Sequence, residues 1–307
     1  MPKILVIKLS ALGDFVLSIG SFQAIRAHHQ GARITLLTTA PYVGLAEASG
    51  CFDEVWVDPR PRWWKIATWL ALARRLRRAG FDRVYDLQRS QRTGLYFRLA
   101  GKPEWIGTVA GCTHRYQPPP DRVLHIAERE AAQLALAGIR RVGPPDLSFI
   151  DADVGRFALP RSYALLVPGS APHRPAKRWP AERYAEVARA LAGRGIAPVL
   201  IGGPAERAEL RRIAEGCAEC RDLGGRTDLA EIVTLARGAR VALGNDTGPI
   251  HLIAAAGCPV VVLFSRESHP IKSKPPWPHV HALQRPHLSD LPVDSVLAAL
   301  GAIETDA

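Results

Sequence analysis

The residues best suited to bind a charged ligand lie between Gly244 and His251, in the run Gly-Asn-Asp-Thr-Gly-Pro-Ile-His. Small residues and a hydroxyl at the expected start of a helix would make an anion site from backbone amides and the helix dipole, and a diphosphate would fit there. Asp246 would repel phosphate, so we expect it to bond a sugar hydroxyl or its own loop. His251 could face the same ligand as Thr247 and Gly248, although a lone helical histidine is more often structural.

A second candidate phosphate site follows an earlier apolar run. Gly169 and Ser170 come just after this run, and Lys177 lies shortly before an expected helix. Backbone amides at Gly169 and Ser170 could approach a phosphate, while Lys177 supplies a point charge beside the positive end of the helix. The segment is not a Walker A loop, because Gly-Lys-Ser/Thr is absent. A solvent-exposed lysine in a flexible loop is an equally good interpretation of Lys177 taken alone.

A carboxylate follows the first expected strand. Asp14 comes directly after Gly13, which permits a tight turn, and an apolar helical pattern continues behind it. The side chain could cap the helix N-terminus, or it could act as a general base toward a bound ligand. Its position at the end of a strand does not separate these two roles.

Short β-branched runs alternate with longer amphipathic segments, which is typical of βαβ units on a parallel sheet. A Pro/Gly-rich passage at residues 140–145 interrupts the series. We therefore predict an α/β fold of two doubly wound, Rossmann-like domains, 1–150 and 151–307, facing across a cleft, with the last helix as a candidate to pack back on the first domain. In such sheets ligands bind beyond the carboxyl ends of strands. The expected strands are 3–7, 33–37, 54–57, 83–86, 163–167, 198–201, 241–243 and 259–264.

Composition excludes several classes of protein. The chain has 307 residues, 47% hydrophobic and 22% charged, and no apolar stretch near the ~18 residues of a membrane span. The first eight residues are too short an apolar run for a secretory signal, and five dispersed cysteines fit reduced thiols. We therefore expect a soluble, cytoplasmic protein.

Charge is concentrated in the first half of the chain. Residues 1–150 carry 21 Lys/Arg and 12 Asp/Glu, a net +9, whereas the remainder carries 19 and 17, a net +2. Between Arg60 and Lys102, twelve basic residues face two acidic ones, and three tryptophans are interleaved. This pattern fits either an anionic partner or the solvated face of an amphipathic helix, and one face could serve both roles.

Three motifs together resemble a known family. They are Leu12-Gly13-Asp14, Lys177-Arg178-Trp179-Pro180, and Asp246-Thr247-Gly248 with His251 three residues later. Their order and spacing are similar to those of bacterial heptosyltransferases, family nine of the glycosyltransferases, which build the inner core of lipopolysaccharide. The resemblance implies a GT-B architecture with the acceptor on the first domain and the nucleotide sugar on the second.

The same resemblance implies residue roles. Asp14 matches the catalytic base of an inverting transfer. Lys177 and Ser170 match positions around the donor diphosphate, as do Asp246, Thr247, Gly248 and His251, and Glu206 resembles the acidic residue that bonds the nucleotide ribose. The acceptor side would include Arg60, Gln88 and Arg92.

Some features depart from the family or point elsewhere. The run at residues 265–270, Ser-Arg-Glu-Ser-His-Pro, replaces a Gly-Pro-Thr-Asp run, which leaves the donor sugar open with ADP-heptose as the default from resemblance. Asp151-Ala152-Asp153 spells a metal-binding pattern but lies between the domains, so we expect no metal and no cofactor. Cys217 and Cys220 lack a second pair, so free thiols are the better interpretation.

The resulting hypothesis is an inverting, metal-independent glycosyltransferase that moves a heptose or related sugar from an ADP-sugar to a phosphorylated, lipid-linked saccharide of the lipopolysaccharide-core type. Its basic, tryptophan-containing stretch would meet acceptor phosphates and could contact the cytoplasmic face of the inner membrane. The alternatives are another GT-B nucleotide-sugar enzyme, such as an epimerase or a transferase with a different donor, and a basic nucleic-acid-binding protein. The last lacks any helix-turn-helix, zinc-finger or RNP-type motif, so no nucleic-acid partner is expected.

Overall fold

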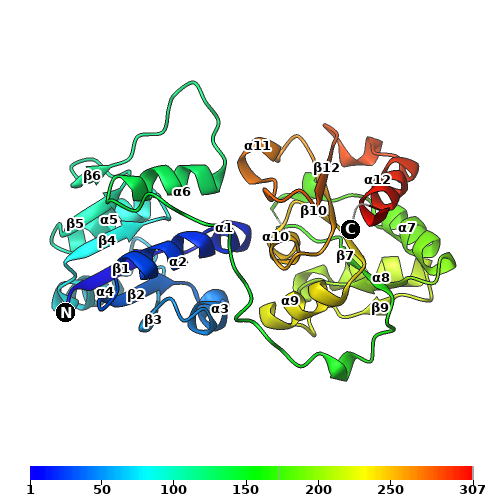
Figure 1. The fold of residues 1–307 in the computed structure, drawn as a ribbon, viewed down its shortest axis with the longest axis horizontal. Coiled ribbons are helices and arrows are strands. Elements are labelled where there is room, and N and C mark those ends of the chain that lie inside the picture. Colours follow the sequence, from blue (N-terminus) through cyan, green and yellow to red (C-terminus); the bar gives the residue numbers. More distant parts are fainter. Residues whose placement is uncertain (172, 306–307) are drawn as a thin grey trace. The chain divides into compact units, whose positions relative to one another are not determined.

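The computed structural model describes residues 1–171 and 173–305, which form two compact units (Figure 1). The first unit runs from Met1 to Phe149, and the second begins at Ile150. The division lies a few residues after the Pro/Gly-rich passage at 140–145. Among the helices that the structure describes, none combines the length and apolar character needed to cross a membrane.

The first unit is built on six parallel strands in the order β3-β2-β1-β4-β5-β6. Helices α4 and α5 pack on one face of this sheet, where their apolar side chains meet those of the strands. The strands are β1 (Lys3–Ile7), β2 (Arg33–Thr38), β3 (Glu54–Val57), β4 (Arg83–Asp86), β5 (Glu104–Gly107) and β6 (His114–Arg115). The helices are α1 (Leu12–Leu17), α2 (Ile19–His28), α3 (Val43–Ala48), α4 (Ile66–Ala79), α5 (Gln91–Leu99) and α6 (Ile126–Ala135).

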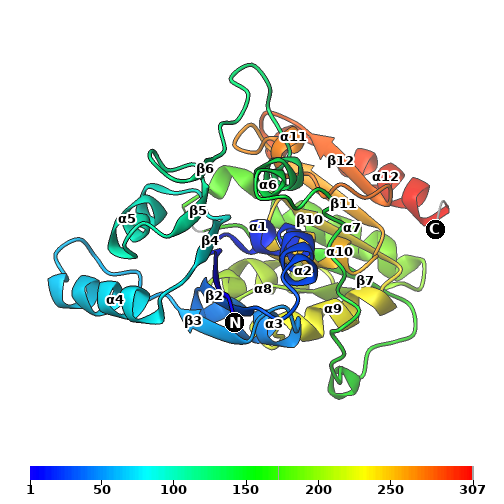
Figure 2. The same ribbon diagram turned by 60° about the vertical axis from the view of Figure 1, so that its left-hand side comes forward.

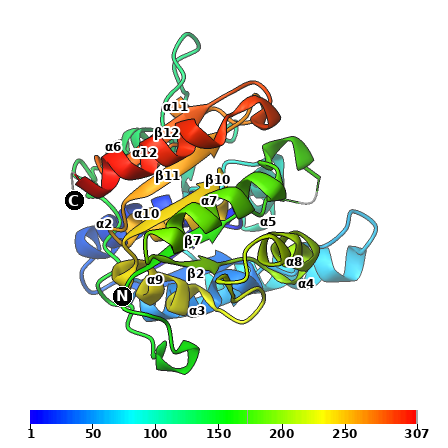
Figure 3. The same ribbon diagram turned by 90° about the vertical axis from the view of Figure 1, so that its right-hand side faces the viewer.

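The second unit repeats this topology with the order β12-β11-β10-β7-β8-β9, again all parallel. Helices α7 and α12 cover one face of the sheet, as Figure 3 shows. The strands are β7 (Tyr163–Val167), β8 (Ala197–Leu200), β9 (Arg221–Asp222), β10 (Val241–Asn245), β11 (Val260–Phe264) and β12 (Val280–Gln284). The helices are α7 (Ala181–Gly193), α8 (Arg207–Gly216), α9 (Leu229–Gly238), α10 (Gly248–Ala255), α11 (Pro270–Ser273) and α12 (Val293–Thr305).

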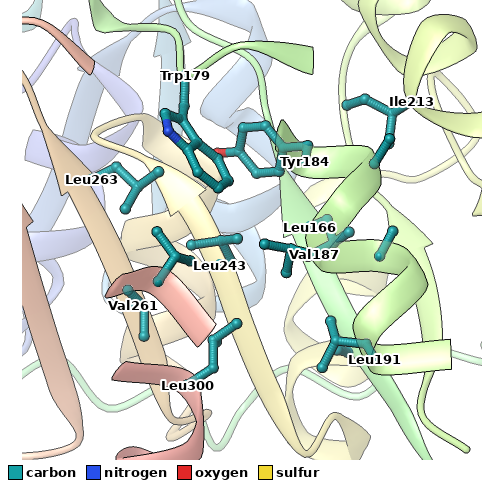
Figure 4. Close-up of a cluster of buried hydrophobic side chains, with 14 of the residues drawn as sticks. Leu166, Trp179, Tyr184, Val187, Leu191, Ile213, Leu243, Val261, Leu263 and Leu300 are labelled. Carbon is teal, nitrogen blue, oxygen red and sulfur yellow. The ribbon is translucent and has the colours of Figure 1, made fainter. Parts of the chain in front are cut away.

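The core of the second unit explains where its last helix goes. Alternate residues of β10 and β11, such as Leu243 and Val261, point to one face of the sheet and meet apolar side chains of α7 (Figure 4). Leu300 of α12 is fully buried in the same cluster. The apolar stripe of the last helix therefore completes the core of its own unit, and the expectation that this helix packs back on the first domain stays a prediction.

Strand order determines where ligands can bind in each unit. The chain crosses to the other side of the sheet after β3 and again after β9, so β1 lies beside β4 and β7 lies beside β10. Such a reversal leaves a crevice at the carboxyl ends of the two central strands. Most of the predicted site residues follow one of these four strands, either on the loops after β1, β4, β7 and β10 or in the first turns of the helices that come next.

Candidate active sites at the carboxyl edges of the two sheets

At the edge of the second sheet, the Asp246 carboxylate contacts the side chains of Lys177 and His251. Its Oδ2 lies 2.7 Å from Lys177 Nζ, and its Oδ1 lies 3.2 Å from His251 Nε2. Burial alone would raise the pKa of Asp246, but the hydrogen bond and charge of His251 and the charge of Lys177 hold that pKa well below its usual range. Asp246 is therefore a buried carboxylate that fixes the Lys177 ammonium beside the start of α10. The interpretation of Lys177 as a solvent-exposed loop residue was wrong, since its side chain is only 12% exposed.

The start of α10 leaves two buried polar atoms unpaired. Thr247 is the N-cap residue, and its side chain makes no capping bond. Thr247 Oγ1 and His251 Nδ1 are buried and have no hydrogen-bond partner within the described residues. An unpaired buried polar atom costs about 1–3 kcal/mol, so a ligand that bonds these atoms recovers that free energy. With the amide of Gly248 and the positive end of the helix dipole, they form a site suited to an anion.

Asn245, which the sequence analysis assigned no role, connects the loops of this edge. Its Nδ2 donates to the carbonyls of Pro168 (2.5 Å) and Gly169 (3.3 Å). Its Oδ1 accepts from the backbone N–H of Trp179 (3.2 Å) and from the Tyr184 hydroxyl (3.1 Å). Asn245 is fully buried, so a polar residue ending an apolar strand was the signal that could have revealed it. Asn245 therefore holds both ends of the segment between β7 and α7, which carries Lys177, against the end of β10.

Ser170 and Glu206 occupy different positions around the loop after β7. Ser170 Oγ donates to the carbonyl of Arg174 (3.0 Å) and accepts from Arg178 Nε (3.1 Å), so its hydroxyl shapes the loop. Glu206 Oε2 accepts from the N–H of Gly203 (2.6 Å). A Cβ at Gly169 would lie 1.7 Å from Glu206 Oε1, so any side chain at this position would displace the carboxylate from its place beside the loop after β7.

Asp14 lies in the first turn of α1 and is partly exposed. The interpretation of Asp14 as an N-cap was wrong, because Ala11 is the N-cap residue and Asp14 is the third residue of the helix. Within the part of the chain that the structure describes, no hydrogen bond or ion pair engages the Asp14 carboxylate. Its charge acts on Tyr42 and on Arg129, whose pKa values respond to it. The carboxylate therefore keeps its lone pairs available at the edge of the first sheet.

Gln88 supports the loop that leads to Asp14. Its Oε1 accepts from the backbone N–H groups of Leu9 (2.7 Å) and Ser10 (3.0 Å). Asp86 shapes the same turn, because its Oδ1 accepts from the N–H of Gln88 (3.1 Å) and of Arg89 (2.9 Å). Burial raises the pKa of Asp86 to about 6, and these backbone bonds only partly oppose the shift. The carboxamide oxygen of Gln88 is thus committed to the protein, and its Nε2 also donates to Ser10 Oγ (3.5 Å), which leaves one N–H of the carboxamide for a ligand.

A buried ion pair lies beneath α1. Lys8 Nζ is 2.9 Å from Glu130 Oε1, and both side chains are almost wholly buried. Ser18 donates to Glu130 Oε1 (2.7 Å) and Ser21 donates to Glu130 Oε2 (2.8 Å). These bonds connect β1, the start of α2 and α6 around the helix that carries Asp14. The pair was missed because its members are 122 positions apart; a lysine directly after an apolar strand was the available signal.

The guanidinium group of Arg129, whose pKa responds to the charge of Asp14, also escaped the sequence analysis. Burial and the neighbouring Arg89 lower the pKa of Arg129, while the charge of Asp14 opposes that shift. Arg89 Nε and Arg129 Nε are both buried without a hydrogen-bond partner in residues 1–171 and 173–305. An anionic ligand group would satisfy these donors.

The predicted acceptor residues Arg60 and Arg92 come together at the loop after β3, which carries Arg60 and which the Arg92 side chain reaches from α5. Asp58, buried after β3, accepts from the N–H of Arg60 (2.8 Å) and from the Tyr96 hydroxyl (2.7 Å). Arg92 donates to the carbonyl of Pro61 (3.2 Å), next to Arg60. The structure therefore groups Arg60 with Arg92, and Gln88 with the loop before Asp14. In the second unit it groups Lys177, Asp246, Thr247, Gly248 and His251.

Comparison with known proteins agrees with this topology. The model of "Glycosyltransferase family 9 (heptosyltransferase)" matches residues 69–292. Lipopolysaccharide heptosyltransferase 2 of Escherichia coli (strain K12) is 29% identical over 296 residues, which cover 87% of this chain and 83% of that protein.

Solved structures give the same result. A glycosyl transferase family 9 protein from Veillonella parvula DSM 2008 superposes with a TM-score of 0.87 at 22% identity, covering 100% of this chain and 98% of that one. The E. coli ADP-heptose lps heptosyltransferase II gives 0.83 at 26% identity and covers 99% of each chain. With two Rossmann-like units of the heptosyltransferase GT-B type and a family match over most of its length, the chain is an enzyme of glycosyltransferase family 9.

Proposed function

We propose that this enzyme transfers a heptose from ADP-heptose to an anionic saccharide of the lipopolysaccharide core, with inversion at the anomeric carbon and without a metal ion. Relatives whose names specify a lipopolysaccharide heptosyltransferase and an ADP-heptose enzyme support the donor and the acceptor class. The observation that carries the proposal is the cluster of Lys177, Asp246 and His251 at the start of α10, beside the unpaired Thr247 Oγ1.

The second unit would bind the donor through its diphosphate. The Lys177 ammonium has three protons, of which one meets Asp246 Oδ2 at 2.7 Å and a second meets the Asp246 carbonyl at 3.5 Å, so the third remains for a phosphate oxygen. Because Lys177 already neutralises Asp246, this carboxylate does not repel the diphosphate as its charge alone would suggest. Glu206 Oε1 would accept a hydrogen bond from a ribose hydroxyl, since its Oε2 is engaged by Gly203.

The first unit would activate the acceptor through Asp14. The carboxylate takes the proton of the acceptor hydroxyl while the hydroxyl oxygen attacks the anomeric carbon from the side opposite the diphosphate. The new glycosidic bond forms as the bond to the diphosphate breaks, which inverts the configuration. The leaving ADP takes the bonding electrons, and Lys177 with the α10 amides stabilises its negative charge in place of a divalent cation. Arg60, Arg92 and Arg129 would meet acidic groups of the acceptor.

Asp14→Asn tests the assignment of the base. The variant keeps the size of the side chain, and the Asp14 carboxylate forms no hydrogen bond or ion pair within the described residues, so we expect folding and ADP binding to remain as in the wild type. Transfer should fall by at least about 10²-fold, in line with the loss of a general base. Thermal shift with ADP, UDP and GDP measures nucleotide binding and preference. Normal turnover by Asp14→Asn would refute the assignment, and conversion of the donor sugar without acceptor would favour an epimerase.

A further inference from the structure

The surface around the start of α4 exposes large apolar side chains without a partner. Trp63 is 82% exposed, Trp64 48%, Ile66 67% and Leu70 48%. In residues 1–171 and 173–305, ten large hydrophobic side chains are exposed, and these four fall within eight consecutive positions. Figure 2 shows α4 and the loop before it at an edge of the first unit. A contiguous apolar patch of this kind indicates an interaction site.

The core of the first unit does not need this patch. The face of α4 that packs on the sheet consists of Leu72, Ala73 and Leu76, all buried. Ile66 and Leu70 lie in the first two turns of α4, before this buried stretch, and both are exposed. The loop rings of Trp63 and Trp64 pack edge to face with their centroids 5.3 Å apart. The interpretation of α4 as an amphipathic helix with a solvated face is confirmed for its arginines, but the first turns of that face are apolar.

The charge of this surface has one sign. Residues 59–79 contain seven Lys/Arg and no Asp/Glu. Arg74, Arg75 and Arg78 line a groove of about 480 Å³ together with Trp56, and the Arg75 guanidinium lies 3.8 Å from the centroid of the Trp56 ring. None of the arginines of α4 forms a salt bridge with any described residue. The groove therefore presents uncompensated guanidinium groups that suit phosphate.

Apolar and basic side chains are ordered along the helix axis. With a rise of about 1.5 Å per residue, Arg74 lies about 12 Å from Ile66 along α4. Apolar side chains of membrane-docked segments enter the boundary between headgroups and acyl chains to a depth of about 5–10 Å. With Trp63, Trp64 and Ile66 in that boundary, a helix axis inclined to the membrane plane places the arginines, two to three turns further along, at the level of lipid phosphates. Tryptophan is the residue type enriched at this depth.

We propose that the loop 59–65 and the exposed face of α4, together the α4 surface, dock the enzyme on an anionic phospholipid bilayer. Trp63, Trp64, Ile66 and Leu70 insert into the headgroup boundary, and the arginines of α4 bind lipid phosphates. A nucleic acid would match the charge but would leave the exposed aliphatic side chains of Ile66 and Leu70 unburied. The side chains that this docking uses, those of Trp63, Trp64, Ile66, Leu70 and the arginines of α4, are distinct from the residues assigned to the donor, to the acceptor and to catalysis.

Flotation with vesicles tests the α4 surface without donor or acceptor. The wild type should bind vesicles of equal parts phosphatidylglycerol and phosphatidylcholine, bind phosphatidylcholine alone far less, and dissociate as salt increases. Trp63→Ser/Trp64→Ser should weaken binding about tenfold or more through loss of apolar insertion. Arg74→Gln/Arg78→Gln should weaken binding and reduce its dependence on salt.

Matched variants distinguish docking from a general effect of mutation. Leu70→Ser should reduce binding, whereas Leu136→Ser, at a residue that is similarly exposed (44%) on the end of α6, should not. Unchanged thermal midpoints and unchanged transfer to a soluble acceptor fragment would show that the variants fold. The proposal is overturned if the wild type does not bind anionic vesicles, if Trp63→Ser/Trp64→Ser binds them as well as the wild type, or if duplex DNA competes the protein off the vesicles at stoichiometric amounts.

Discussion

Lys177→Met separates the electrostatic role of the lysine from its role in the fold. In the wild type, Lys177 and Asp246 form a buried pair, with side-chain exposures of 12% and 7%. Methionine keeps the length and apolar stem of lysine but removes the charge. Asp246 is then left with His251 as its partner, 3.2 Å away.

The expected effects follow from this burial. Removal of one partner of a buried ion pair costs about 3–5 kcal/mol, and the remaining His251 contact places the loss near the lower value, about 3 kcal/mol. For a unit of this size such a loss lowers Tm by roughly 6–12 °C. If Lys177 also stabilises the leaving diphosphate, kcat should fall by about 10²–10³-fold, the effect of losing one donor to developing charge.

The double variant Lys177→Met/Asp246→Asn tells the two effects apart. It removes both charges, so the unpaired carboxylate disappears, and the free energy of unfolding in urea should return to within about 1 kcal/mol of the wild type. Transfer activity should stay as low as in Lys177→Met, because the cation is still absent. Activity of the single variant within threefold of the wild type, or recovery of activity in the double variant, would refute the proposed role of Lys177.

Three further substitutions test the supporting structure. Gly169→Ala should displace the Glu206 carboxylate, which a Cβ would approach to 1.7 Å, and weaken ADP binding measured by calorimetry about tenfold; unchanged affinity would contradict the assignment of Glu206. Glu130→Gln leaves the Lys8 ammonium buried without its counter-charge and should cost about 3–5 kcal/mol in urea unfolding, whereas a loss below 1 kcal/mol would show that the pair does not organise the fold. For Asp86 the folded pKa of about 6 lies above the unfolded value of 3.8, so the native state binds its proton more tightly and stability falls as pH rises between these values, by about 3 kcal/mol in all. Asp86→Asn should remove this part of the decline in unfolding free energy between pH 4 and 7, and an unaltered pH profile would contradict the shift.

Central strands were predictable because each is a short apolar run bounded by turn residues. The expected limits of β1, β3, β4 and β7 agree with the structure, and those of the four others differ by one or two residues. The strands that escaped prediction lie at or next to sheet edges. β6 and β9 have two residues each, and β5 and β12 contain polar residues without a regular alternation. A strand that is solvated on part of its surface does not need a continuous apolar sequence.

Some features of the candidate site were likewise predictable from the sequence, and others were not. The loops after β1, β7 and β10 were predictable because glycine, small polar residues and charge follow an apolar run there. The partners within the site were not predictable: Lys177 is 69 positions from Asp246, and Gln88 is 79 positions from the Leu9 amide that it binds. Gln88 illustrates the limit, because its residue type fits a ligand contact as well as the backbone contact that it makes.

The sequence alone therefore determined the fold class and the family motifs, since periodicity, turn residues and local spacing are properties of neighbouring residues. Only the tertiary structure decided that Asp246 neutralises and holds Lys177, that Asp14 is not a cap, and that a buried Lys8–Glu130 pair lies under its helix. These depend on strand order, because the reversal of each sheet beside its first strand brings loops from distant parts of the chain to one edge. Burial of the side chains at that edge then determines which of them are charged and which form ion pairs or hydrogen bonds with one another.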